Sequence, residues 1–212
     1  MNRSTIITAL SFLVFLLLIN LNLPAQITDT TKSGKYIFTR VKELPATSVK
    51  DQSASGTCWS FATTSFLESE ILRLKKDTLD LSEMYFVRKC YEEKANRYIR
   101  LHGTGNFGEG GQAHDVLNAV REYGMVNNAD YTGLANGQTK PNHSELEAIL
   151  KAMVDVLVKN PAGKLSPEWM KACNAVLDVY LGKLPENTSW NGLQVSPAEF
   201  RDKNSGRLPR SA

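Results

Sequence analysis

Apolar residues recur with a helical period along most of the chain after residue 58. Between residue 58 and about residue 76, spacings of three, four and seven define overlapping faces, which carry Ala62, Phe66 and Ser69 together with Leu67, Ile71 and Leu74. Such spacing is typical of an amphipathic helix, and the breadth of the stripe indicates burial. We therefore predict a long, largely buried helix that begins at Cys58.

Two further helices are predicted before residue 125. Ser82 is a plausible N-cap for a helix that runs to about Arg100. A glycine-rich loop, HGTGNFGEGG, follows it. The stretch QAHDVLNAVREYG then predicts a third helix, with Gly124 just past its end. Its expected apolar face consists of Val116, Leu117, Val120 and Tyr123.

The remaining helices are marked by their capping residues. Residues 125–142 carry no periodic pattern and are expected to form a loop. Ser144 and Glu147 have the spacing of a capping box, which predicts a helix from residue 145 to about 159. The dipeptide Ser166-Pro167 favours the start of a fifth helix, and Gly182 its end.

The C-terminal stretch combines a turn signal with a helix start. Trp190-Asn191-Gly192-Leu193 is typical of a β-hairpin turn. Ser196, Pro197 and Glu199 have the N-cap, N1 and N3 pattern of a helix start. We expect residues 201–212 to be an irregular tail, so that the sequence reads as a chain cut short within a helix.

The N-terminal residues have a different character. One early Arg3 precedes an apolar run over residues 6–21, and Pro24 and Ala25 follow it. This composition predicts a signal peptide over residues 1–25 and an exported protein, periplasmic or secreted, without membrane contact after cleavage. An uncleaved membrane anchor is the alternative, since the run is nearly long enough to span a bilayer. Residues 26–57 carry no helical period and are expected to be extended.

Size and charge exclude some classes of function. The 212 residues suggest one domain or slightly more. The net charge of +3 is small, and both signs are interspersed along the chain. Nucleic-acid binding usually requires a clustered basic surface. We therefore expect no nucleic-acid partner.

Three cysteines remain after the predicted signal peptide, at positions 58, 90 and 173. An odd number in an exported chain leaves at least one free thiol or an intermolecular link. Cys90 and Cys173 either pair with each other or are two small buried apolar residues. Their positions within predicted helices favour burial.

Cys58 has the surroundings of a nucleophile. A cysteine attacks as the thiolate, and a helix N-terminus favours negative charge because its N–H groups are unpaired. Gly56 allows a close backbone approach just before the helix. Gln52 carries an amide donor, which could form an oxyanion hole together with the Cys58 backbone N–H.

The pattern Gln52-x5-Cys58-Trp59-x-Phe61-Ala62 resembles the active-site segment of papain-like cysteine peptidases. Ser55 departs from the secreted papain branch, which usually has a disulfide cysteine there. This departure makes the chain similar to the bleomycin hydrolase/aminopeptidase C branch, as do LSEMYFVRKCYEE, NAVREYGMV and the glycine pair before Gln112. The resemblance implies an α+β papain-like fold, of which residues 26–200 supply mainly the helical domain.

The same resemblance implies roles for single residues. Cys58 would be the nucleophile and Gln52 the oxyanion donor, while Gly110, Gly111 and Trp59 would line the substrate-binding cleft. The implied substrate is a peptide, with no cofactor and no metal ligand. Intact members of this branch form homo-oligomers. Their catalytic His and Asn come from a β-rich domain later in the chain, which is expected to be largely missing here.

The histidines of this chain are expected to be non-catalytic. We interpret His102 and His143 as surface or capping residues, and His114 as a residue near the cleft without a catalytic role. The main hypothesis is therefore a cysteine (amino)peptidase that is inactive as this chain alone. The alternatives are a secreted, non-catalytic peptide-binding protein on the same scaffold, and a non-functional truncation.

Overall fold

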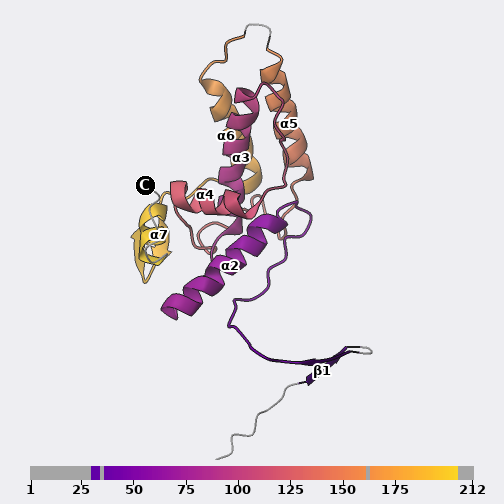
Figure 1. The fold of residues 1–212 in the computed structure, drawn as a ribbon. Coiled ribbons are helices and arrows are strands. Elements are labelled where there is room, and N and C mark those ends of the chain that lie inside the picture. Colours follow the sequence, from indigo (N-terminus) through magenta and orange to yellow (C-terminus); the bar gives the residue numbers. More distant parts are fainter. Residues whose placement is uncertain (1–29, 34–35, 161–162, 205–212) are drawn as a thin grey trace, which may run out of the picture. The chain divides into compact units, whose positions relative to one another are not determined.

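The computed structural model describes residues 30–33, 36–160 and 163–204 (Figure 1). It divides into two units, residues 1–44 and residues 45–212. In the first unit, β1 (Thr30–Ser33) and β2 (Tyr36–Thr39) form an antiparallel hairpin with Thr30 opposite Thr39. This confirms the extended character expected after residue 26. The signal peptide predicted for residues 1–25 lies outside the described residues.

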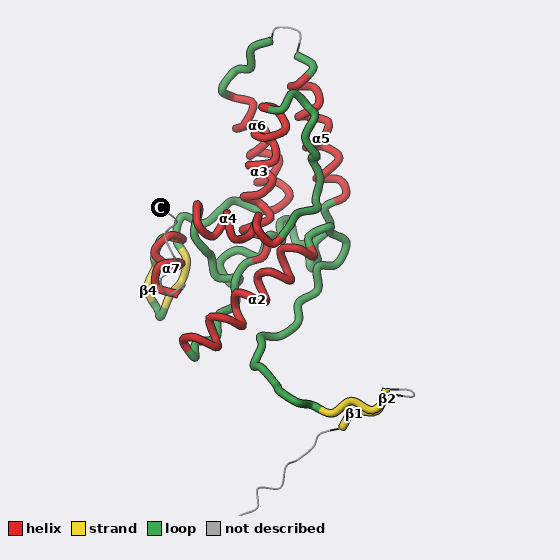
Figure 2. Tube along the Cα trace, in the orientation of Figure 1, coloured by secondary structure: helices red, strands yellow, loops and turns green. Residues whose placement is uncertain are grey.

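The second unit is mainly helical (Figure 2). Its elements in chain order are α2 (Cys58–Lys75), α3 (Glu83–Arg100), α4 (Ala113–Tyr123), α5 (Ser144–Val158), α6 (Glu168–Leu181), β3 (Thr188–Trp190), β4 (Leu193–Val195) and α7 (Pro197–Asn204). Helix α3 lies at the centre and contacts α2, α4, α5 and α6. Helices α3, α5 and α6 form a bundle (Figure 1). None of the described helices has the length and apolarity needed to cross a membrane.

Apolar packing holds this bundle together. Phe86 of α3, Leu150 of α5 and Leu177 of α6 are all buried in one core. The start of α3 is fixed as the sequence predicts, because the Ser82 hydroxyl accepts a hydrogen bond from the Tyr85 backbone N–H at 3.0 Å. The helix ends at Arg100, also as predicted.

Helix α2 has the predicted bounds, but the prediction of its buried face is only partly right, because Ile71 is buried and Leu67 packs against the core while other members of that face are exposed. Phe66 is 60% exposed and Leu74 is 63% exposed. Besides Ile71, the face that packs inward carries the polar residues Ser60, Thr64 and Glu68. Polar groups can be buried when partners satisfy their hydrogen bonds, and this is the case for Ser60, whose hydroxyl donates to the Glu83 carbonyl oxygen at 2.9 Å.

Helix α4 differs from the prediction at one position of its apolar face. Val116 and Val120 are buried, whereas Leu117 is exposed and Ala119 is buried in its place. Gly124 ends the helix with a φ of 86°. A Cβ there would lie 2.2 Å from the Pro197 carbonyl carbon, so the end of α4 lies directly against the start of α7.

Helix α5 begins one residue earlier than predicted, and Ser144 is not its N-cap. His143 occupies the N-cap position without a side-chain capping bond, and Ser144 is the first helical residue. The Ser144 hydroxyl donates to the Asn142 side-chain oxygen at 2.8 Å instead. Helix α6 agrees with its prediction, with Pro167 at the N-cap position and Gly182 after its last residue.

The predicted hairpin and final helix start are both confirmed. Asn191 and Gly192 have φ values of 48° and 79°, which suit the tight turn between β3 and β4. At the start of α7, Ser196 and Glu199 form a reciprocal capping box, with bonds of 2.9 Å and 3.3 Å. Helix α7 continues to Asn204, so residues 201–204 are helical rather than irregular. Residues 205–212 lie outside the described part.

Candidate active site

Cys58 is the first residue of α2, and its thiol is free and exposed. The N–H groups of a first helical turn have no partners within the helix and favour a negative charge beside them. The first turn of α2 holds no acidic residue that would oppose this effect. The structure therefore places Cys58 as the sequence predicts.

The loop before Cys58 is folded onto itself by short hydrogen bonds. The Gln52 side-chain amide donates to the Ser55 carbonyl oxygen at 2.7 Å, and the Ser55 hydroxyl donates to the Gln52 carbonyl oxygen at 2.8 Å. Ser55 also shares a hydrogen bond of 2.6 Å with the buried hydroxyl of Thr57. A carboxamide has two N–H donors, so the Gln52 amide retains one for a ligand.

Trp59 joins the cysteine to the predicted glycine pair. Its indole N–H donates to the Glu109 carbonyl oxygen at 3.0 Å. Gly111 lies against the indole ring so closely that a Cβ would be 2.6 Å from a ring carbon, and only glycine fits there. Gly110 is exposed, with no atom within 4 Å of a Cβ built on it. Two of the predicted residues, Trp59 and Gly111, are thus in direct contact.

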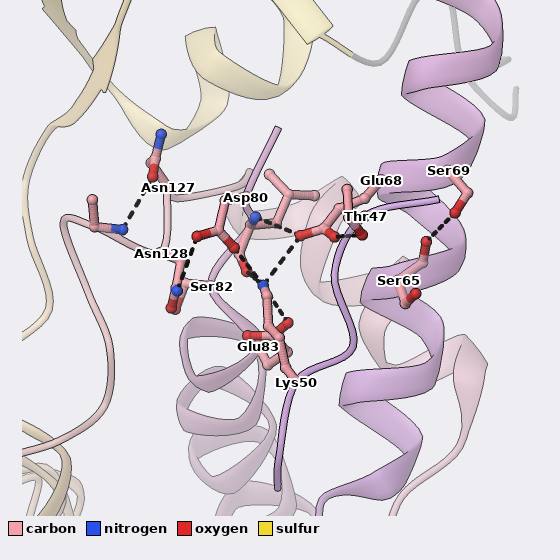
Figure 3. Close-up of polar contacts among 12 residues, drawn as sticks. Thr47, Lys50, Ser65, Glu68, Ser69, Asp80, Ser82, Glu83, Asn127 and Asn128 are labelled. Carbon is pink, nitrogen blue, oxygen red and sulfur yellow. Dashed lines mark hydrogen bonds and ion pairs between the residues drawn. The ribbon is translucent and has the colours of Figure 1, made fainter. Parts of the chain in front are cut away.

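A partly buried ionic cluster, which the sequence analysis missed, anchors the segment that carries Gln52 (Figure 3). The Lys50 ammonium lies 2.5 Å from Asp80, 2.7 Å from Glu83 and 3.3 Å from Glu68, and it also donates to the Leu81 carbonyl oxygen at 3.1 Å. Glu68 and Glu83 are almost fully buried, with side-chain exposures of 1% and 6%. Lys50 precedes Gln52 by two residues, so this cluster restrains the position of the segment that carries Gln52.

The charges of this cluster perturb one another. Burial lowers the pKa of Lys50 more than any single partner raises it, but the bonds and charges of Asp80, Glu83 and Glu68 together outweigh burial and raise this pKa. Burial raises the pKa of Glu83, and the Lys50 ammonium opposes that effect only in part. Glu68 accepts two further bonds, from the Thr47 hydroxyl at 2.5 Å and from the Leu81 N–H at 2.7 Å.

A second polar group that the sequence analysis missed holds the glycine pair. The Lys94 ammonium donates to the carbonyl oxygens of Gly108 and Gly110 at 2.9 Å and 2.5 Å, and it lies 5.3 Å from the centre of the Trp59 ring. The Glu109 carboxylate accepts a hydrogen bond from the Gly56 N–H. A sequence signal did exist, because Lys94 lies one turn after the buried Cys90 and Tyr91 on α3.

None of the three histidines forms a hydrogen bond or ion pair with Cys58 in the described part of the chain. His102 is exposed at the end of α3, as expected. His114 is exposed in the first turn of α4, with its Nε2 3.4 Å from the Asp115 carboxylate. The surface position expected for His143 is wrong: its side chain is buried, and neither ring nitrogen has a partner among the described residues.

Cys90 and Cys173 are both free and buried, as the sequence favoured. Burial raises the pKa of Cys90 to about 12 and also raises that of Cys173. Cys90 lines a groove of about 410 Å³ between α3 and α4, which Cys58 and Gln52 do not line. In the described ranges, no three His, Cys, Asp or Glu side chains gather in a way that could hold a metal ion.

Comparison with known proteins agrees with this arrangement. Residues 35–175 match the model of the papain family cysteine protease. Cysteine proteinase 2 of Entamoeba histolytica is 27% identical over an alignment of 145 residues, and the match covers 58% of this chain and 43% of that protein. Mitochondrial cysteine proteinase 1 of Saccharomyces cerevisiae is 29% identical over an alignment of 118 residues, and the match covers 47% of this chain and 24% of that protein.

A solved structure shows the same fold. PepW from Lactobacillus rhamnosis aligns with a TM-score of 0.58 and 19% identity, over 77% of this chain and 45% of that one. The chain thus spans less than half the length of these relatives. The fold is papain-like and mainly helical in the described part, and the matched segment includes Cys58, Trp59 and the glycine pair. On this evidence, the chain belongs to the papain family of cysteine proteases.

Proposed function

We propose that Cys58 is the nucleophile of a cysteine peptidase. In this reaction the thiolate attacks a peptide carbonyl carbon, the C–N bond breaks, and the leaving amine takes up a proton. Water then hydrolyses the resulting thioester and restores the thiol. The single observation that carries the proposal is the contrast between Cys58, exposed at the start of α2, and the two buried cysteines.

The oxyanion of the intermediate would be stabilised by two donors on the same loop. The Cys58 backbone N–H belongs to the unpaired first turn of α2, and the Gln52 amide keeps one N–H beyond its bond to Ser55. Preorganised donors of this kind are typical of acyl-transfer sites. The hydrogen bonds of Ser55 and the anchoring of Lys50 support this role, because they restrict the movement of the loop.

The substrate in this proposal is a peptide that lies along the glycine pair. Gly110 is open to solvent and Gly111 lies flat against Trp59, so neither would obstruct an extended peptide backbone. We further propose that the enzyme belongs to the bleomycin hydrolase/aminopeptidase C branch and removes N-terminal residues. The motifs shared with that branch and the serine at position 55 support this finer assignment.

The nucleophile can be tested by covalent labelling. We expect a peptidyl chloromethyl ketone to modify Cys58 alone, as mapped by mass spectrometry, and an excess of competing peptide to slow the reaction. Cys58→Ala should abolish labelling. Labelling of Cys90 or Cys173, or a rate that competing peptide does not change, would contradict the proposal. A reagent with a free amino terminus should react faster than its acetylated counterpart if the aminopeptidase assignment is right.

Peptide turnover by this 212-residue chain should be slow. None of its histidines contacts Cys58 in the described part, and a general base contributes about 10²–10⁴-fold to such reactions. This observation also favours a second candidate, a secreted peptide-binding protein without catalysis. Undiminished peptide binding by Cys58→Ala, together with no turnover by the parent, would support that candidate. Rapid turnover that is lost in Cys58→Ala would contradict it.

We also propose that the protein is exported and that the mature chain begins after residue 25. The apolar run over residues 6–21, with Pro24 and Ala25 after it, supports this. The test is the N-terminal sequence of the protein recovered outside the cytoplasm. Recovery of a chain that still begins at Met1 in the cytoplasmic fraction would overturn it.

A further inference from the structure

Glu109 contacts both segments that would form the active site. Its carboxylate accepts the Gly56 N–H, two residues before the nucleophile, and its carbonyl oxygen accepts the Trp59 indole N–H at 3.0 Å. The residue that follows it is Gly110, the first of the glycine pair. The approach to Gly56 is close, since a Cβ there would lie 2.8 Å from the Glu109 Cβ.

A second carboxyl group lies beside Glu109. Glu147, in the first two turns of α5, lies beside Gly108, because a Cβ built on Gly108 would be 3.0 Å from the Glu147 Oε1, and its side chain and charge interact with those of Glu109. Two carboxylates cannot bond to each other when both are ionised, because each has only acceptors. Two ionised carboxylates so close together repel each other, so the placement of the Glu109 side chain depends on the charge of Glu147.

The groups around this pair come from every element packed against it. Helix α3 contributes Lys94, whose ammonium holds the carbonyl oxygens on either side of Glu109. The other titratable groups are Tyr91 and Cys90 on α3, Asp115 on α4 and His143 at the start of α5. Lys94 is the one cation among these named groups, so it cannot balance Glu109, Glu147 and Asp115 together if all three are ionised.

We propose that Glu109 is a positioning residue that holds the Cys58 loop and the glycine pair in one arrangement, and that a negative charge on Glu147 beside it weakens this arrangement. This inference rests on the proposed peptidase function, because the two segments it joins carry the nucleophile and the substrate-binding glycines. Glu109 acts through the backbone of Gly56 and does not itself react.

The ionisation of Glu147 agrees with this geometry. Burial raises the pKa of Glu147, and the charge and hydrogen bond of Glu109 raise it further. A carboxyl group whose pKa is raised by folding stabilises the fold most below its ordinary pKa, and that stabilisation is lost as the pH rises through the raised value. The hydrogen bond between the Glu109 carboxylate and the Gly56 N–H should therefore weaken as the pH rises.

Two substitutions separate the roles of the two carboxyl groups. The amide of Glu147→Gln has no charge and can donate to Glu109 at every pH. The hydrogen bond between Glu109 and Gly56 should then be independent of pH. Glu109→Gln can accept from Gly56 and donate to Glu147, and it should preserve the arrangement. Glu109→Ala removes the acceptor. Glu145→Gln, an exposed change near the start of α5, is the matched control.

The first measurement is the rate of Cys58 modification by an uncharged peptidyl chloromethyl ketone, divided by the rate with iodoacetamide at the same pH. This ratio cancels the ionisation of the thiol and reports on the positioning of a peptide. Glu109→Ala should lower the ratio by about tenfold or more, since hydrogen bonds to charged groups are among the stronger ones. Glu109→Gln and Glu145→Gln should keep the ratio of the parent. In the parent this ratio should decrease as the pH rises, and in Glu147→Gln it should not.

The second measurement is amide hydrogen exchange at Gly56, followed by NMR, and it needs no reaction at Cys58. We expect protection in the parent that decreases as the pH rises beyond the general increase in exchange rate, and protection in Glu147→Gln that does not. An unprotected Gly56 in the parent, or a pH response that Glu147→Gln leaves unchanged, overturns the inference even if Glu109→Ala fails to fold. Failure of Cys58 to react with the peptidyl reagent while Gly56 behaves as expected would instead count against the proposed function.

Discussion

The loop that leads to Cys58 and the bundle of α3, α5 and α6 are held in place by different forces. The bundle is packed through apolar side chains such as Leu150 and Leu177. The loop is held by Lys50 on one side and by Glu109 on the other, through ion pairs and hydrogen bonds. Apolar packing is non-directional, whereas polar contacts fix direction and respond to pH. The contacts that depend on direction and on pH therefore lie in the loop beside Cys58.

The largest expected effect comes from removing the cation of the polar region. Lys50→Met leaves Glu68 and Glu83 buried without their ion-pair partner, and such a loss destabilises a protein by about 3–5 kcal/mol. We expect urea unfolding to show this decrease. Lys140→Met is the matched control, because Lys140 pairs with Asp51 on the surface, and it should change stability little. If the two substitutions destabilised the protein equally, the pairing of Lys50 with buried carboxylates would contribute no more stability than the surface ion pair of Lys140.

An apolar truncation in the bundle should have a comparable or somewhat smaller effect. Leu150→Ala deletes a fully buried side chain, which costs about 2–5 kcal/mol from lost burial and the cavity left behind. Its cost should be the same at every pH, because Leu150 has no charge. The rate of Cys58 alkylation in the folded variant should remain that of the parent. A marked change in that rate would show that the bundle also sets the geometry of the loop.

The pH dependence of the Lys50→Met defect should separate the two regions most clearly. Burial already raises the pKa of Glu83, and loss of the ammonium should raise it further. A carboxyl group with a raised folded pKa stabilises the fold fully below its unfolded value of about 4.3, and that stabilisation is lost as the pH rises. The difference between Lys50→Met and the parent should therefore shrink as the pH falls, by about 1.4 kcal/mol for each unit of additional pKa shift that is passed. A pH-independent difference, like that of Leu150→Ala, would contradict the charge-based account.

Sequence reasoning succeeded where local signals decide the structure. The cap at Ser82, the turn at Asn191-Gly192 and the capping box at Ser196 all involve residues within four positions of each other. The position of Cys58 at a helix start is also a local feature, and its neighbouring motif identified the family.

The errors concern burial that is decided by distant partners. In the sequence, Glu68 of α2 has the character of a surface residue. It is buried because it forms an ion pair with Lys50 and accepts a hydrogen bond from the Leu81 N–H. Phe66 has the apolar character of a core residue, and it is exposed. Glu109 and Gly56 are 53 positions apart in the sequence, and no periodic pattern in either segment predicts their contact.

The smallest predicted effect tests two serines that share one sequence pattern. Ser144 and Ser196 are each followed three residues later by a glutamate, but only Ser196 forms the capping box, while Ser144 donates to Asn142. Ser196→Ala should therefore destabilise the fold by about 1 kcal/mol, the usual cost of losing a serine N-cap. Ser144→Ala should have a smaller effect, since alanine is a better helix former than serine and partly offsets the lost bond. Urea unfolding of the two variants decides the matter: equal losses would mean that the shared pattern, and not the contact each serine makes, determines stability.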